Sequence, residues 1–328
     1  MTQTDLQAVE NLTRAYEALR SEIAKVIVGQ TEVVEQLLIA LLSNGHCLLV
    51  GVPGLAKTLL ISTVAQVLNL RFSRIQFTPD LMPSDITGTD ILEEDHTTGK
   101  RMFRFVKGPV FANIVLADEI NRTPPKTQAA LLEAMEERQV SIDGKTFPLS
   151  ESFMVVATQN PIEQEGTYPL PEAQVDRFLV KIILDYPEAS EEREIIGRYG
   201  KAVSAHDLEA MGLKRLPEGE WAVRLRKHVA QVKVEEGIVG YVQTLVEQTR
   251  NSPHIYLGAS PRGGIALLKT SRCLAALEGR DYITPDDVKR MALPVLRHRV
   301  ILRPEAELEG LNPDKVITRI LDTVTVPR

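Results

Sequence analysis

The stretch His46–Leu60, HCLLVGVPGLAKTLL, decides the fold of this chain. It predicts a short apolar strand (Cys47–Val50), a glycine-bearing loop (Gly51–Ala56) and a helix that opens at Lys57. The N–H groups of such a loop and the N-terminus of the helix attract an anion, and Lys57 adds a full positive charge. The Thr58 hydroxyl can ligate Mg²⁺, so the stretch predicts a phosphate-binding site.

One position departs from the general phosphate-loop pattern G-x-x-x-x-G-K-[ST], because Ala56 stands where the pattern has its last glycine. Alanine is acceptable there if the position has right-handed helical geometry, since only a positive φ penalises a β-carbon. The alternative for this stretch is an ordinary strand–turn–helix in which Lys57 is merely solvated. The rest of the chain has to decide between the two.

Length and composition indicate a soluble globular protein of about two domains, with 328 residues, 44% of them hydrophobic and 25% charged. The net charge of -6 argues against a protein that binds duplex DNA without regard to sequence. Cys47 and Cys273 are the only cysteines, so we expect neither a disulfide framework nor a cysteine zinc site. The chain shows no secretory leader and no apolar run approaching ~18 residues, and we expect a cytoplasmic protein without a membrane span.

Apolar segments alternate with helical patterns over residues 46–184, which predicts a parallel sheet with right-handed crossovers. The expected strands after the first one are Phe72–Phe77, Phe111–Ile120, Phe153–Thr158 and Phe178–Leu184. Helices are expected at about 5–25, 31–42, 55–68 and 125–138.

Polar side chains stand where two of these strands end. Asp118 and Glu119 close the strand FANIVLADEI, and two adjacent carboxylates there are costly unless they meet a cation or water. Asn160 follows the next strand, and ligands of open α/β sheets bind at the carboxyl ends of strands. The alternatives are a solvated Asp-Glu turn and, for Asn160, an ordinary turn residue before proline.

Two segments read as hairpins outside the sheet. Residues 89–108 form an excursion with a polar tip, Glu93–Lys100, and a returning alternation of apolar and charged residues. Val140–Leu149 alternates around Asp143-Gly144, a strong two-residue turn signal.

Strand signals fade after Tyr186, and helical patterns follow at 188–199, 221–230, 235–250, 262–278 and 285–293. We therefore expect a domain boundary near 186, with one domain over 1–186 and a second over 187–328. Ser260 and Pro261 predict a helix start, which places Arg262 at the positive end of the helix dipole. A residue in such an unfavourable place is a candidate functional residue, and the alternative is an interdomain salt bridge.

Taken together, the segments GVPGLAKT, IVLADEINR, VVATQNP and LPEAQVDRF resemble the AAA+ ATPases in order and spacing. More narrowly, they resemble the MoxR subfamily, where alanine at the last glycine of the loop is usual. The resemblance extends from VIVGQ at 26–30 to GASPRGG at 258–264 and DYITPDDV at 281–288. It implies an α/β fold: a five-stranded parallel P-loop sheet flanked by helices, followed by a C-terminal all-helical lid domain that carries Arg262.

The resemblance also implies the ligands, which are ATP and Mg²⁺. Lys57 would contact the β- and γ-phosphates, and Thr58 and Asp118 would hold Mg²⁺, partly through water. The residues implied to surround the nucleotide are Val28, Gly29 and Gln30 on the adenine side and Gly51, Val52, Pro53, Gly54, Leu55, Ala56, Lys57, Thr58 and Leu59 around the phosphates.

The catalytic roles implied by the resemblance fall on four residues. Glu119 would be the base that polarises the attacking water, and Asn160 the sensor 1 residue that positions it. Arg177 would be the arginine finger delivered to a neighbouring subunit's ATP, and Arg262 would be sensor 2. Arginine fingers contribute about 10³–10⁵ in rate, so a ring, expected to be a closed homohexamer, follows as a hypothesis.

MoxR-type proteins are thought to act as chaperone-like remodellers that mature or insert cofactors into partner proteins, often ones with a von Willebrand factor A domain. The two hairpins would be the helix-2 insert and the pre-sensor-1 hairpin, facing a central pore. Alternatives are a helicase-like nucleic-acid motor, a magnesium-chelatase-type motor subunit and a nucleotide-gated scaffold. The acidic balance and the few basic and aromatic hairpin residues argue against nucleic acid, and the intact Asp118-Glu119 pair argues against a scaffold.

Overall fold

Five parallel strands form the central sheet in the computed structural model, which describes residues 3–94, 101–142, 144–162, 166–200, 212–215 and 221–327. The strand order is β2-β5-β8-β1-β9, and every pairing between neighbours is parallel. This confirms the predicted sheet. Its strands are β1 (Cys47–Gly51), β2 (Phe72–Gln76), β5 (Ile114–Asp118), β8 (Met154–Gln159) and β9 (Val180–Leu184).

Each face of the sheet is covered by helices, because alternate residues of a strand point to opposite sides. Ile114 and Leu116 of β5 join a core with α1 (Gln3–Ala24), α2 (Thr31–Leu42) and α3 (Lys57–Val67). Val115 and Ala117 join a second core, which contains Leu131 and Leu132 of α5 (Pro125–Glu137). The sheet is therefore the middle layer of three.

The bounds differ from the expected ones where proline or short elements intervene. β5 begins at Ile114 rather than Phe111, because Pro109–Phe111 forms a 3₁₀ turn (η1) first. A stretch rich in turn residues contains a short helix, α4 (Pro83–Thr87), with proline at its first position. A second short helix, α6 (Glu172–Val175), precedes β9, and η2 (Ile120–Arg122) follows β5.

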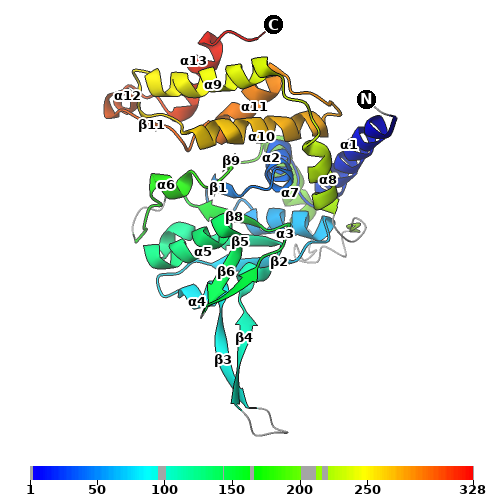
Figure 1. Cartoon of the computed structure of the whole chain (residues 1–328), viewed down its shortest axis with the longest axis vertical. Helices are drawn as coiled ribbons and strands as arrows, with labels where there is room; N and C mark the ends of the chain where they lie inside the picture. The colour runs from blue at the N-terminus through cyan, green and yellow to red at the C-terminus, as the bar shows by residue number, and fades with distance from the viewer. Residues whose placement is uncertain are drawn as a thin grey trace.

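Both expected hairpins are present. β3 (Gly88–Glu94) pairs antiparallel with β4 (Arg101–Lys107) and projects as a ribbon from the body of the molecule (Figure 1). β6 (Gln139–Ile142) pairs with β7 (Lys145–Pro148). Of the expected polar tip Glu93–Lys100, the first two residues belong to β3, and residues 95 to 100 lie outside the described residues, as does the turn residue Asp143. The two hairpins touch through Phe105 and Phe147, whose rings stack with centroids 4.3 Å apart.

The described residues of the C-terminal part are helical apart from one small sheet, a single bridge between Lys233 and Tyr282, and the connecting loops. Its sheet pairs three residues of β10 (Ile255–Leu257) with two of β11 (Ile301–Leu302), too few for an alternation to show in the sequence. α11 also runs three residues past the expected end at 293 and includes Pro294. The helices are α7 (Ala189–Tyr199), α8 (Trp221–Val229), α9 (Glu236–Asn251), α10 (Pro261–Leu277), α11 (Pro285–Leu296), α12 (Pro304–Leu308) and α13 (Pro313–Thr323).

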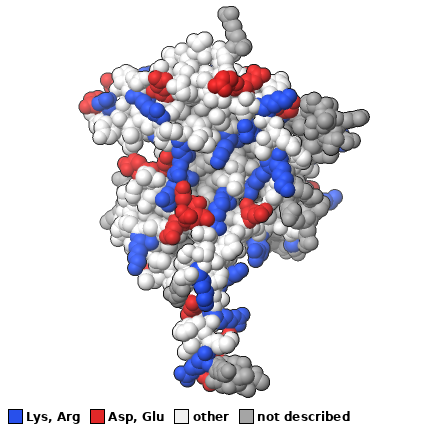
Figure 2. Space-filling view, in the orientation of Figure 1, with Lys and Arg blue, Asp and Glu red and all other residues white. Residues whose placement is uncertain are grey.

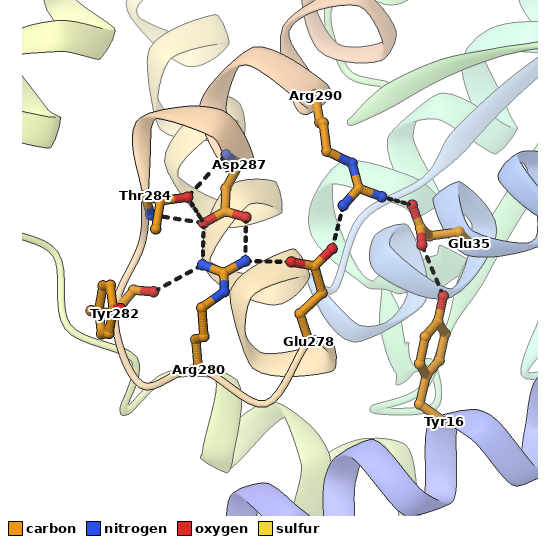
Figure 3. Close-up of polar contacts among 8 residues, drawn as sticks. All are labelled: Tyr16, Glu35, Glu278, Arg280, Tyr282, Thr284, Asp287 and Arg290. Atoms are coloured by element: carbon orange, nitrogen blue, oxygen red, sulfur yellow. Dashed lines mark hydrogen bonds and ion pairs between the residues drawn. The ribbon is translucent and has the colours of Figure 1, made fainter. Parts of the chain in front are cut away.

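A chain of ion pairs joins this helical part to the N-terminal helices (Figure 3). Arg290 of α11 pairs with Glu35 of α2 at 2.7 Å and with Glu278. Tyr16 of α1 donates to the other oxygen of Glu35 at 3.1 Å. Burial and the neighbouring Glu35 charge both raise the pKa of the Tyr16 hydroxyl, which therefore remains protonated.

The same chain continues to a buried carboxylate at the start of α11. Arg280 contacts both oxygens of Asp287 at 2.6 Å, and Asp287 is only 2% exposed. Asp287 also accepts the backbone N–H of Thr284 at 2.7 Å, so it caps the helix as well (Figure 3). The hydrogen bonds to Asp287, together with Glu278, raise the pKa of the Arg280 guanidinium.

Candidate active site

A mostly apolar cavity of about 360 Å³ lies beside the N-terminus of α3. Its size is within the range of small-molecule sites. Residues expected around a nucleotide line it, namely Val28, Gln30, Pro53, Gly54, Leu55, Ala56 and Leu59. Gly29, Gly51 and Val52 do not line it, and Lys57 and Thr58 begin the adjoining helix.

Sequence reasoning missed one wall of this cavity. The segment after β9 contributes Tyr186, Pro187, Glu192, Ile195, Ile196 and Tyr199. Tyr186 and Ile196 are 74% and 64% exposed, which is unusual for apolar side chains beside a cavity. The spacing of Ile195, Ile196 and Tyr199 was the available signal, because it puts them on one face of α7.

Ala56 has left-handed geometry, with φ 52° and ψ 32°, so the right-handed condition stated for alanine is not met. The loop turns sharply into α3 at this residue, and the carbonyl of Ala56 already accepts the N–H of Leu60 at 2.9 Å. Gly54 in the same loop also has a positive φ, 88°. A β-carbon in this region costs about 1–2 kcal/mol, so Ala56 is strained by roughly that amount.

The Lys57 ammonium lies over the loop and donates to the carbonyl of Gly51. Burial lowers the pKa of Lys57, while the charges of Asp118 and Glu119 oppose this shift. Lys57 is therefore close enough to both carboxylates to interact with them. Lys57 is half-buried against the loop and not fully solvated.

Asp118 and Glu119 stand at the carboxyl end of β5, beside β2. Arg74 Nη2 pairs with Asp118 Oδ2 at 2.7 Å. Gln76 Nε2 donates to Glu119 Oε2 at 3.0 Å, and Arg122 pairs with the same oxygen at 3.1 Å. The carboxylates thus have protein partners and do not form a solvated turn.

Sequence reasoning also missed these partners. Arg74 and Gln76 flank Ile75 in the strand FSRIQ, and this spacing of two signals that they share one side of β2. Thr158 of β8 contacts both carboxylate residues as well: its hydroxyl donates to Asp118 Oδ1 at 2.6 Å and accepts the N–H of Glu119 at 2.8 Å. The sequence pattern identified Thr158 only as the last residue of an apolar strand.

Asn160 follows β8, which lies between β5 and β1 in the sheet. The side chain is 8% exposed, and its Oδ1 accepts the N–H of Ile162 at 3.2 Å, a bond typical of a turn residue. Asn160 lines a second cavity, of about 500 Å³, together with Gln159 and Lys181. It does not line the cavity beside α3.

Arg177 and Arg262 line a separate groove of about 250 Å³, where both contact the same carboxylate. Arg262 pairs with Glu136 of α5 at 2.8 Å, and Arg177 contacts the same carboxylate at 3.6 Å. The interdomain salt bridge that was the alternative for Arg262 is therefore present. Neither arginine lines the cavity beside α3.

Basic side chains dominate this groove, and Figure 2 shows a band of Lys and Arg across the middle of the molecule. Arg299 from the loop after α11 pairs with Asp176 at 2.7 Å and donates to the carbonyl of Phe178 at 2.7 Å. Ser260 stands at the N-cap of α10, but its hydroxyl donates to Asp176 at 3.0 Å instead of capping the helix. The helical part thus holds the segment that carries Arg177.

Within the described ranges, no helix combines the length and the apolar character that crossing a membrane requires. The same ranges contain no cluster of three or more metal-binding His, Cys, Asp or Glu side chains.

Comparison with known proteins matches both parts of the chain to AAA families. Residues 46–180 match the model of the ATPase family associated with various cellular activities (AAA), and residues 247–320 match the AAA lid domain. A crystal structure of a candidate ATPase from Cytophaga hutchinsonii superimposes with a TM-score of 0.89 at 41% identity, over 98% of each chain.

Similar individual proteins indicate which AAA+ subfamily this is. The chain is 47% identical to Chaperone MoxR1 of Mycobacterium tuberculosis, over 94% of this chain and 81% of that protein. It is 32% identical to Protein MoxR of Methylorubrum extorquens, over 93% of each chain. These similarities extend over nearly the whole sequence, and the chain therefore belongs to the MoxR family of AAA+ ATPases.

Proposed function

We propose that this chain is a Mg²⁺-dependent, ATP-hydrolysing motor whose active site is shared between neighbouring subunits. The observation that carries the proposal is the position of the loop Gly51–Ala56, which Lys57 contacts, and of the Asp118–Glu119 pair at the same carboxyl edge of the parallel sheet, beside a cavity of about 360 Å³. A cation, two carboxylates and a helix N-terminus at one edge are the groups that phosphoryl transfer to water needs.

The cavity beside α3 would bind the adenosine part of ATP. Its walls include Leu59 and Leu60 of α3 and Ile195 and Ile196 of α7, together with Val26, Ile27, Val28 and Gln30. Exposed Tyr186 and Ile196 gain cover when a base lies between α7 and the loop, which supports this assignment. The loop Gly51–Thr58 would then carry the phosphates, with Lys57 donating to the β- and γ-oxygens.

The donor set fits Mg²⁺, which prefers hard oxygen ligands. Thr58 offers a hydroxyl at the second position of α3, and Asp118 offers a carboxylate that already contacts a cation, the Arg74 guanidinium, at 2.7 Å. These two residues would hold the ion, which would neutralise charge on the phosphate oxygens. Arg74 would have to leave Asp118 Oδ2 for that purpose.

Glu119 would orient the attacking water and accept its proton, and Asn160 would position the water as sensor 1. Gln76 and Arg122 restrain the Glu119 carboxylate from two sides, which supports a directed rather than a solvated role. Asn160 directly follows β8, the strand between those that lead to Asp118 and to the phosphate loop. A modest rotation of its amide away from Ile162 would be required.

Arg177 and Arg262 would act on the ATP of a neighbouring subunit. Both lie in the groove around Glu136 rather than at the cavity beside α3, and this separation supports delivery in trans. An interface that joins two different faces generates a ring when it closes, and we propose a homohexamer. The β3–β4 and β6–β7 hairpins would face the pore of that ring.

The biological role proposed is chaperone-like remodelling or maturation of client proteins, including proteins with a von Willebrand factor A domain. One relative carries the name Chaperone MoxR1, which supports this assignment. We also propose a cytoplasmic location, an ATPase domain that ends near residue 186 and a lid domain that follows it.

Steady-state ATP turnover of the Glu119→Gln variant tests the catalytic assignment. We expect turnover to fall at least about 100-fold while nucleotide binding persists, since the variant keeps the shape but loses the base. Glu133→Gln, on the exposed side of α5, is the matched control and should retain turnover. Unchanged hydrolysis by Glu119→Gln would refute the assignment.

Mixed assemblies test the shared site. Lys57→Ala removes the phosphate side of a subunit, and Arg177→Ala removes its finger, so each homogeneous variant should be inactive. Mixing the two restores some interfaces with both intact halves, and turnover should recover partially. No recovery at any mixing ratio would contradict delivery in trans.

A further inference from the structure

Thr158 is buried where three functional segments meet. It is the fifth residue of β8 and 1% exposed, and it precedes Asn160 by two positions. Ala117 of β5 is in register with Ala157 of β8, so Asp118 and Thr158 are the next opposed pair and point to the same side of the sheet. That side is the one covered by α3, because Leu116 and Val156 join the α3 core.

The Thr158 hydroxyl makes two hydrogen bonds to the Asp-Glu pair, one as donor and one as acceptor. Its proton goes to Asp118 Oδ1 at 2.6 Å, and its oxygen accepts the backbone N–H of Glu119 at 2.8 Å. A hydroxyl has one proton to donate, so this arrangement leaves it no freedom to rotate. One side-chain atom therefore fixes a carboxylate of one residue and the backbone of the next.

Glu119 needs such a restraint because its backbone is left-handed, with φ 58° and ψ 49°. A non-glycine residue in this region persists only where its surroundings hold it. The turn at Glu119 ends β5 and starts η2, and it determines the direction in which the side chain leaves the sheet. The neighbouring strand β8 restrains that turn through the hydrogen bond from Glu119 N–H to Thr158.

We propose that Thr158 is a positioning residue for ATP hydrolysis: its hydroxyl locks Asp118 and the left-handed turn at Glu119 in the arrangement used for catalysis. The proposal rests on the function proposed above, in which Asp118 holds Mg²⁺ and Glu119 directs the water. Thr158 itself touches neither substrate nor metal. It acts through its two neighbours on β5.

Two substitutions at this position separate the hydroxyl from packing. Thr158→Val keeps the branched shape and removes the hydroxyl, whereas Thr158→Ser keeps the hydroxyl and loses a methyl group. We expect kcat to fall about 10- to 100-fold in Thr158→Val, because a buried N–H and a carboxylate each lose a partner. We expect Thr158→Ser to stay within about threefold of the parent.

A purely structural role would reverse this order, because packing in a buried strand favours valine over serine. The KM for ATP should change by less than about threefold in both variants, since Lys57 and the cavity beside α3 are untouched. Thr158→Val with normal kcat, or Thr158→Ser as impaired as Thr158→Val, would overturn the proposal. If Thr158→Val does not fold, Thr158→Ala and Thr158→Ser form a second pair, differing only by the hydroxyl.

Glu119→Gln distinguishes failure of this inference from failure of the proposed function. If Glu119→Gln is inactive and Thr158→Val is normal, only the role of Thr158 is wrong. If Glu119→Gln is active, the catalytic assignment itself is wrong.

Discussion

Replacing Ala56, the N-cap residue of α3, by glycine should stabilise this protein, although glycine adds conformational freedom to the unfolded chain. Ala56 has φ 52° and ψ 32°, where a β-carbon costs about 1–2 kcal/mol. Glycine removes this strain, but it adds about 0.4–1 kcal/mol of conformational freedom to the unfolded chain. The difference predicts that Ala56→Gly raises the free energy of unfolding by about 0.5–1 kcal/mol.

The matched control is Ala129→Gly, an exposed position inside α5 with right-handed geometry. There the same chemical change has no strain to relieve, and it should lower the free energy of unfolding by about 0.5–1 kcal/mol. Guanidinium unfolding of the nucleotide-free protein measures both variants. If Ala56→Gly is destabilised as much as Ala129→Gly, Ala56 is right-handed in solution and the reasoning is wrong.

Other predictions concern single buried groups. Burial lowers the pKa of His46 from 6.5 to about 3, so its contribution to stability is complete above about pH 6.5 and is lost as the pH falls towards 3. At pH 5 the loss should be roughly 2 kcal/mol, and His46→Gln should lack this part of the pH dependence in unfolding measured at pH 8 and pH 5. Asp287→Ala should lower the free energy of unfolding by about 1.5–3 kcal/mol, because it removes the buried carboxylate that pairs with Arg280 and caps α11, while Arg280 keeps Glu278 as a partner, and a loss below 1 kcal/mol in chemical unfolding would contradict this. Phe147→Leu should cost about 0.5–1.5 kcal/mol beyond the area lost, and a double-mutant cycle with Phe105→Leu should show that this coupling belongs to the pair.

The sequence was sufficient for the sheet because its strands are buried and apolar and end at recognisable polar residues. Five expected strands are the five strands of the sheet, and the helices at 31–42 and 125–138 agree with α2 and α5 within one residue. Pattern reasoning failed where an element is too short to show a period, as in α4 and the β10–β11 pair. It also failed where one proline predicts an end, since α11 continues past Pro294.

The candidate site was predictable only as far as its residues stand in local motifs. Asp118 ends a strand, Glu119 follows it, and Lys57 opens the helix after another strand, so the parallel sheet places all three at its carboxyl edge. Arg74 and Thr158 were missed because their contacts cross between strands, and a single sequence does not show which strands are neighbours. The left-handed backbone of Ala56 could not be predicted for a different reason: the φ and ψ angles of one residue depend on the path of the whole loop.

The stacked rings of Phe105 and Phe147 couple the projecting β3–β4 hairpin mechanically to the β6–β7 hairpin. β3 has seven residues, so the ribbon is a lever arm of about 24 Å. β4 leads through η1 into β5, which ends at Asp118, and β7 leads into β8, which contains Thr158. A force that bends the far end of the ribbon would therefore exert torque, through one aromatic contact and two strands, on both sides of the hydrogen bond between Thr158 and Asp118.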